Sequence, residues 1–122
     1  MDGKQAGTFK VGLGPYSVAF DGADIWVGNA GDGTVTKLRA SDGAVLGTFT
    51  VGDAPYGLAF DGANIWAAAS SVVRELRKSD GAILFTFPLL PCCSYGAAFD
   101  GANIWVTHGH SDVSKLQTAL IE

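Results

Sequence analysis

A block of eleven residues occurs three times along this chain of 122 residues. All copies begin with Tyr, contain Ala-Phe-Asp-Gly-Ala and end with Ile-Trp; they occupy residues 16–26, 56–66 and 95–105. Successive copies are 40 and 39 residues apart. A second block, residues 37–49, returns at 76–87 with Leu-Arg, Ser-Asp-Gly-Ala and Thr-Phe in the same order. The chain is therefore three copies of one structural unit of about 40 residues.

Each unit contains four short runs of strand-forming residues separated by turn signals. In the first unit the runs are residues 16–20, 25–27, 35–38 and 45–51. They are rich in β-branched and aromatic residues, which favour pleated, half-buried positions. Asp-Gly pairs follow the first and third runs, and glycine readily takes the positive φ that two-residue hairpins need. We expect hairpin turns at these pairs and tryptophans that anchor the core between sheets.

Four antiparallel strands in about 40 residues are typical of a β-propeller blade. The first run of each unit carries small residues, which suit the crowded innermost strand: Ser17, Ala19, Gly57, Ala59, Gly96 and Ala98. Pro88 falls in the fourth run, and proline is tolerated in a sheet chiefly at its edge. We predict an all-β fold of three propeller blades, at residues 15–53, 54–93 and 94–122.

The number of blades predicts a partner. Closed propellers have about four to eight blades, and three would leave apolar sheet faces open at both ends. The third unit has no fourth run after residues 113–116, whereas residues 7–12 match the fourth run at 47–52. We therefore expect a homodimer that closes a six-bladed ring, in which residues 1–14 supply the missing strand to the third blade of a second copy.

Composition excludes several classes of protein. The net charge of −4 argues against a surface that follows nucleic-acid phosphates. The 48% hydrophobic and 16% charged content excludes a disordered tail. No apolar run is long enough to span a membrane, and residues 1–8 lack the apolar core of a secretory signal. We expect a soluble protein with no nucleic-acid or membrane partner, and the sequence does not indicate its compartment.

The repeat resembles a known group of propeller repeats. Phe-Asp-Gly-Ala-Asn-Ile-Trp at 99–105, Ser-Asp-Gly at 79–81 and Val-Gly-x-x-Pro-Tyr-Gly at 51–57 are similar to YVTN/NHL-type repeats. Within that group they are most similar to the repeats of streptogramin (virginiamycin B) lyase-like proteins. The resemblance covers nearly the whole chain and implies a propeller fold. Members of that group usually carry more blades on one chain than the three found here.

The resemblance raises the alternative of a metal-dependent lyase, since those enzymes use histidine, glutamate and a divalent metal on one propeller face. The candidates here are His108 and His110, after the second run of the third unit. Cys92 and Cys93 lie in a connection expected on the same face, and thiolates with imidazoles can bind zinc. Their spacing matches no common zinc motif, and we favour the interpretation that the histidines are exposed loop residues while the cysteines fill the blade margin as small hydrophobic residues. We assign no catalytic residue, metal or cofactor.

Aromatic residues suggest a binding surface instead. Tyr16, Tyr56 and Tyr95 begin the innermost strands, near the expected channel mouth, where a sugar or peptide could bind. Alternatively, each tyrosine packs between blades with its hydroxyl bonded to a loop carbonyl. We therefore expect a non-catalytic binding or scaffold module, or a fragment or engineered propeller with no evolved ligand. The candidate ligand is a small molecule or a glycan, and a lectin-like glycan-binding propeller is a further alternative. The candidate ligand-binding residues are the three tyrosines together with His108 and His110.

Overall fold

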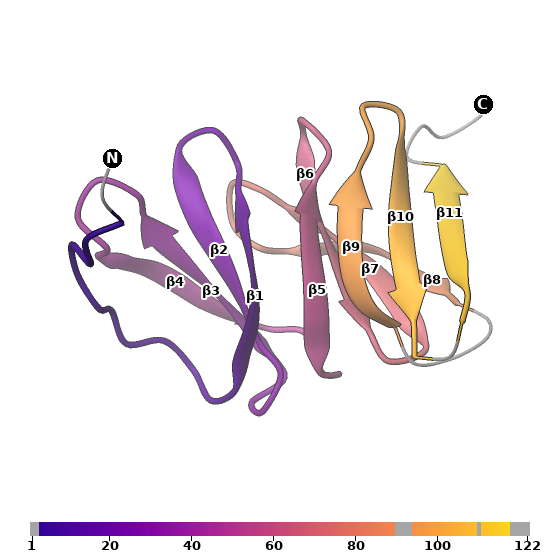
Figure 1. Cartoon of the computed structure of the whole chain (residues 1–122), viewed down its shortest axis with the longest axis horizontal. Helices are drawn as coiled ribbons and strands as arrows, with labels where there is room; N and C mark the ends of the chain where they lie inside the picture. The colour runs from indigo at the N-terminus through magenta and orange to yellow at the C-terminus, as the bar shows by residue number, and fades with distance from the viewer. Residues whose placement is uncertain (1–2, 90–93, 110, 118–122) are drawn as a thin grey trace.

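The computed structural model describes residues 3–89, 94–109 and 111–117, and these form eleven strands in three antiparallel sheets (Figure 1). The first sheet contains β1 (Pro15–Phe20), β2 (Asp24–Asn29), β3 (Thr34–Arg39) and β4 (Val45–Thr50). The second contains β5 (Pro55–Phe60), β6 (Asn64–Ala69), β7 (Val72–Arg77) and β8 (Ile83–Pro88). The third contains β9 (Ser94–Phe99), β10 (Asn103–His108) and β11 (Val113–Gln117). None of the described residues forms a helix that could cross a membrane.

The sheets are arranged as propeller blades. Within each one the strands follow chain order, and the first strands, β1, β5 and β9, lie side by side where the sheets converge (Figure 1). The predicted all-β blade architecture is confirmed. The second strand is longer than expected, because Gly28 and Asn29 continue the ladder by pairing with Val35 and Thr34.

The turns after the innermost strands have the predicted glycine conformation but not the predicted length. Gly22 has a φ of 95°, in the left-handed region. β1, however, ends at Phe20 and β2 begins at Asp24, so three residues rather than two make the connection. The wider loop is stabilised because Asp21 Oδ1 accepts hydrogen bonds from the backbone N–H groups of Ala23 and Asp24, at 2.9 and 2.6 Å.

Two apolar clusters fill the spaces between neighbouring sheets. The cluster between the first and second sheets comprises Trp26, Val35, Val51, Leu58, Ile65, Ala67 and Leu76. The cluster between the second and third comprises Ala59, Trp66, Ala68, Val73, Leu89, Ile104 and Val106. The prediction of tryptophan core anchors is confirmed for Trp26 and Trp66. Trp105 is 39% exposed, because its side of the third sheet faces no other sheet among the described residues.

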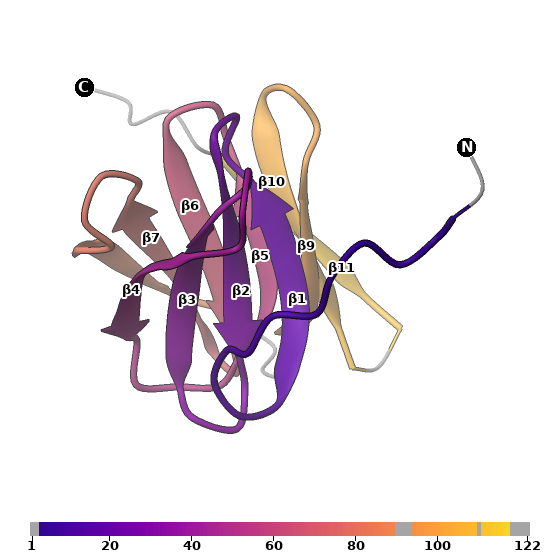
Figure 2. The ribbon, with the colours of Figure 1, turned by 90° about the vertical axis from the view of Figure 1, so that its left-hand side faces the viewer.

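The segment before the first blade belongs to none of the three sheets. Residues 3–10 are exposed and form no strand, and Figure 2 shows them running across the open side of the first sheet and away from it. The Phe9 ring of this segment lies against the first blade: it covers Gly43, where a Cβ would collide with it. Gly43 lies in the turn between β3 and β4.

Candidate functional site

Each blade contains a hydrogen bond between an aspartate and a tryptophan. The aspartate that follows the innermost strand accepts the indole N–H of the tryptophan five residues later, at 2.8 Å for Asp21–Trp26 and 2.7 Å for Asp61–Trp66 and Asp100–Trp105. The Asp-Gly pairs of the sequence predict only a turn role for these aspartates. The constant spacing of five residues between aspartate and tryptophan is the sequence signal that could have predicted the hydrogen bond. Because the bond recurs in every blade, the motif has a structural role.

The hydrogen bonds keep two of these carboxylates ionised. Burial raises the pKa of Asp21, but the hydrogen bonds from Trp26, Asp24 and Ala23 outweigh burial and leave the pKa below its usual value. The hydrogen bonds from Trp105, Asn103 and Ala102 lower the pKa of Asp100 to about 2. These two carboxylates are therefore ionised near neutral pH, where they accept hydrogen bonds and have no proton to donate as general acids.

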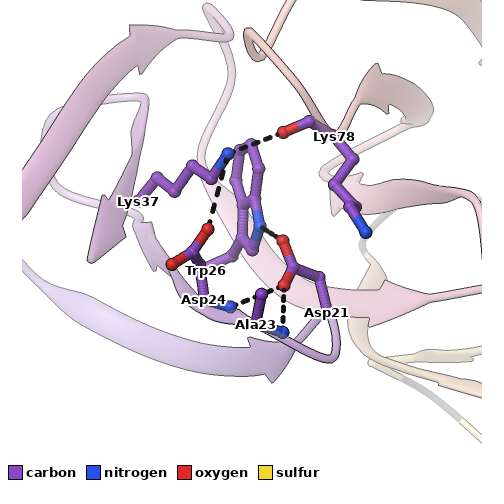
Figure 3. Close-up of polar contacts among 6 residues, drawn as sticks. All are labelled: Asp21, Ala23, Asp24, Trp26, Lys37 and Lys78. Atoms are coloured by element: carbon purple, nitrogen blue, oxygen red, sulfur yellow. Dashed lines mark hydrogen bonds and ion pairs between the residues drawn. The ribbon is translucent and has the colours of Figure 1, made fainter. Parts of the chain in front are cut away.

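A lysine joins the first blade to the second at the same place (Figure 3). Lys37 lies over the Trp26 ring, with its Nζ 5.2 Å from the ring centroid. That Nζ donates a hydrogen bond of 2.9 Å to the Lys78 carbonyl of the next blade and lies 3.7 Å from the carboxylate of Asp24. Lys115 lies over Trp105 in the same way, at 5.5 Å.

The three predicted ligand-binding tyrosines form one row across the innermost strands. The ring centroids are 5.1 Å apart for Tyr16 and Tyr56, and 5.3 Å apart for Tyr56 and Tyr95. The end members are 69% and 52% exposed, so the row borders solvent. None of their hydroxyls forms a hydrogen bond with another described residue. The ring of Tyr95 packs against Gly109, in the loop after β10. The row is an exposed aromatic surface.

His108 is not an exposed loop residue. It ends β10, is buried, and its Nε2 lies 2.7 Å from Ser114 Oγ on the neighbouring strand. Asn29 holds the same position in the first blade, where its Nδ2 donates to Thr36 Oγ1 at 2.8 Å. The sequence reading missed this because β10 extends further than expected.

The other predicted site residues, His110, Cys92 and Cys93, lie outside the described residues. Within the described ranges, no three His, Cys, Asp or Glu side chains gather in a way that could hold a metal ion. Within those ranges the side-chain contact of His108 is with Ser114.

Two apolar depressions adjoin the third sheet. The first has a volume of about 310 Å³ and is lined by Trp66, Phe87, Pro88, Leu116 and Gln117. The second has about 230 Å³ and is lined by Gly96, Ala97, Ala98, Trp105, Val106, Thr107 and Val113. The second depression lies on the side of the third sheet that no other described sheet covers.

Solved structures share this arrangement of blades. Kuenenia stuttgartiensis hydrazine synthase superposes with a TM-score of 0.77 at 19% identity, over 97% of this chain and 36% of that one. The fold is that of a β-propeller. Myxococcus xanthus glutaminyl cyclase matches with a TM-score of 0.75 at 13% identity, over 90% and 50% of the two chains. The Cps50 (Swd1) β-propeller domain of Myceliophteria thermophila matches with a TM-score of 0.72 at 16% identity, over 91% and 38%.

These similarities establish the fold alone. The chain spans between about a third and a half of the length of the solved structures described above. No family model and no curated protein matches its sequence. The resemblance to YVTN/NHL-type and streptogramin lyase-like repeats thus stays an interpretation of the repeat motif.

Proposed function

We propose that this chain is a non-catalytic β-propeller module that serves as a scaffold or binding platform, and that two copies close one six-bladed ring. One observation carries the proposal: equivalent tryptophans differ in burial according to whether a blade follows. Trp26 and Trp66 are 0% and 1% exposed between blades, whereas Trp105 is 39% exposed. The Trp105 face is therefore equipped for another blade.

The opposite end of the chain presents the matching face. Leu58, on β5, is 5% exposed because it packs against the first blade. Its equivalent on β1, Val18, is 69% exposed, and the neighbouring Phe20 is 57% exposed. Placing Val18 and Phe20 of one copy against Trp105 of another would repeat the interface found twice within the chain and cover both apolar faces.

Two copies satisfy the geometry of closed propellers. Six blades lie within the usual range of about four to eight, and a twofold axis is the commonest closed symmetry. Residues 1–14 would complete the third blade of the second copy. The repeat motif supports placing the chain among YVTN/NHL-type propellers, while the contact of His108 with Ser114 does not favour a metal-dependent lyase.

The mass in solution tests the ring. Light scattering should give twice 12.6 kDa for the purified chain. Trp105→Asp should shift the mass toward 12.6 kDa, because a charge in the packed interface is unfavourable. Phe85→Asp is the matched control, since Phe85 is 46% exposed but lies on outer strand β8. A wild-type mass of 12.6 kDa would exclude the ring.

The tyrosine row is the binding surface that we propose for this module. Tyr16 and Tyr95 stand at its two ends, so ring closure would bring Tyr95 of each copy toward Tyr16 of the other. An exposed row of rings favours a planar or glycan ligand, because aromatic faces pack on apolar ligand surfaces. A glycan array tests this: bound glycans should be lost with Tyr56→Ala and retained with Phe85→Ala. Equal binding by both variants would exclude the row as the site.

A further inference from the structure

Both four-stranded blades contain an aromatic pair that joins the second strand to the outer strand. Trp26 stacks on Phe49 with centroids 5.8 Å apart, and Trp66 stacks on Phe87 at 5.6 Å. In the third sheet β11 is an edge strand, and among the described residues no phenylalanine ring stacks on Trp105. The third blade therefore needs one outer strand with a phenylalanine opposite Trp105.

The outer-strand phenylalanine also contacts the next blade. A Cβ on Gly81, in the turn between β7 and β8, would collide with the Phe49 ring of the preceding blade. A Cβ on Gly43, in the equivalent turn of the first blade, would collide with the ring of Phe9. Phe9 thus lies where the outer-strand phenylalanine of a preceding blade would lie, although the chain has no described blade there.

The backbone around Phe9 has the same local shape as an outer strand. The Phe9 ring folds back over Gly7, 2.8 Å from where a Cβ would stand, and the Phe49 ring folds over Gly47 at 2.6 Å. Residues 5–10 are exposed and belong to none of the described strands. The contact of Phe9 with Gly43 positions them against their own first blade.

We infer that residues 5–10 of each copy add to the β11 edge of the other copy as its outer strand, with Phe9 stacked on Trp105. This inference rests on the ring proposed above and specifies what seals it. The ladder between β3 and β4 supplies the register, since it pairs Val35 with Phe49, Thr36 with Thr48 and Lys37 with Gly47. The corresponding pairs between copies are Val113 with Phe9, Ser114 with Thr8 and Lys115 with Gly7.

The lysine over the tryptophan supports the same assembly. Lys37 reaches across a blade boundary to the carbonyl of Lys78. Lys115 has the equivalent position over Trp105, and Ala40 precedes its Ser-Asp-Gly turn as Lys78 does in the second blade. Nζ of Lys115 is therefore placed to donate to the Ala40 carbonyl of the second copy. Because the acceptor of this hydrogen bond is a backbone carbonyl, alanine at position 40 can serve as well as lysine does at position 78.

The larger depression, of about 310 Å³, would receive the start of the donated segment. Phe87 lines it, and the equivalent Phe49 is covered by the turn glycine Gly81. Gly3 has a φ of 68°, close to the 71° of Gly81 and the 75° of Gly43. Gly3 of the second copy would thus lie over Phe87 as Gly81 lies over Phe49.

Disulfide cross-linking between separately labelled copies tests the strand addition. Thr8→Cys and Ser114→Cys are introduced into separate chains that also carry Cys92→Ser and Cys93→Ser. Facing residues on paired strands have Cα atoms about 4.5–5.5 Å apart, which a disulfide can span. Mixing and oxidising the two variants should give a covalent heterodimer on a non-reducing gel. Thr86→Cys, on β8, mixed with Ser114→Cys is the control and should give none.

Light scattering on the same variants separates this inference from the ring itself. A mass of twice 12.6 kDa with the cross-link supports both. That mass without the cross-link would show that the ring closes in another way and would overturn the strand addition. A mass of 12.6 kDa would overturn both. Independently, Phe9→Ala should weaken the dimer at least about tenfold, and Ile83→Ala, at a 44% exposed position on the outer strand β8, should change its dissociation constant little. Equal dissociation constants for these two variants would also overturn the inference.

Discussion

Asp61 accepts a hydrogen bond of 2.7 Å from the indole N–H of Trp66, and the side chain of Trp66 is 1% exposed. The same carboxylate also accepts the backbone N–H groups of Ala63 and Asn64, at 2.8 and 2.7 Å. One aspartate therefore shapes the turn after β5 and holds the ring that fills the space between the second and third blades. Loss of this carboxylate should affect folding more than loss of an ordinary turn residue.

We predict that Asp61→Ala lowers the free energy of unfolding by about 1–3 kcal/mol, because it leaves the buried indole N–H of Trp66 without an acceptor. Urea unfolding followed by tryptophan fluorescence measures this. Asp80→Ala is the control: Asp80 makes its contacts in an exposed turn, so the loss should be at most about 1 kcal/mol. Equal losses in the two variants would refute the role of the indole hydrogen bond.

The low pKa of Asp100 predicts acid sensitivity. Its pKa is lowered from 3.8 to about 2 by the hydrogen bonds from Trp105, Asn103 and Ala102. The stability from this ionised carboxylate is fully present above the unfolded-state value near 3.8 and is lost as the pH falls toward 2. The difference in urea midpoint between wild type and Asp100→Asn should therefore shrink between pH 5 and pH 2. A constant difference over that range would contradict this prediction.

His108 should be replaceable by the residue that holds its position in the first blade. His108→Asn should change the free energy of unfolding by less than about 1 kcal/mol, because an asparagine amide can reach Ser114 as Asn29 reaches Thr36. His108→Leu should cost about 1–3 kcal/mol, since it leaves the Ser114 hydroxyl without this partner. Chemical denaturation compares the two variants. The prediction fails if Asn is as damaging as Leu.

Lys37 should stabilise the boundary between the first two blades. Its side chain is 13% exposed, and its Nζ bonds to the carbonyl of Lys78. Lys37→Met keeps the apolar stem and removes the donor, so we predict a loss of about 1–2 kcal/mol in unfolding free energy with no change in solution mass. Denaturation and light scattering check the two parts. An unfolding free energy equal to that of wild type would contradict this role of Lys37.

The repeat made most of the fold predictable. Its Asp-Gly pairs, strand-forming runs and small innermost residues predicted blades, turns and the outer position of Pro88, which lies on β8. These features depend on residues near one another in sequence. The prediction for His108 failed, because the extension of β10 to this residue depends on pairing with Ser94 of β9 rather than on local residue preference.

The sequence by itself determined that each unit forms one blade, since alternation of side chains and turn chemistry act within about 40 residues. Only the tertiary structure decided which identical motifs are buried. Trp66 and Trp105 stand in the same local motif, yet only Trp66 has a following blade against which to pack. Burial is a property of the neighbouring sheet, and no local pattern around a tryptophan encodes whether that neighbour is present.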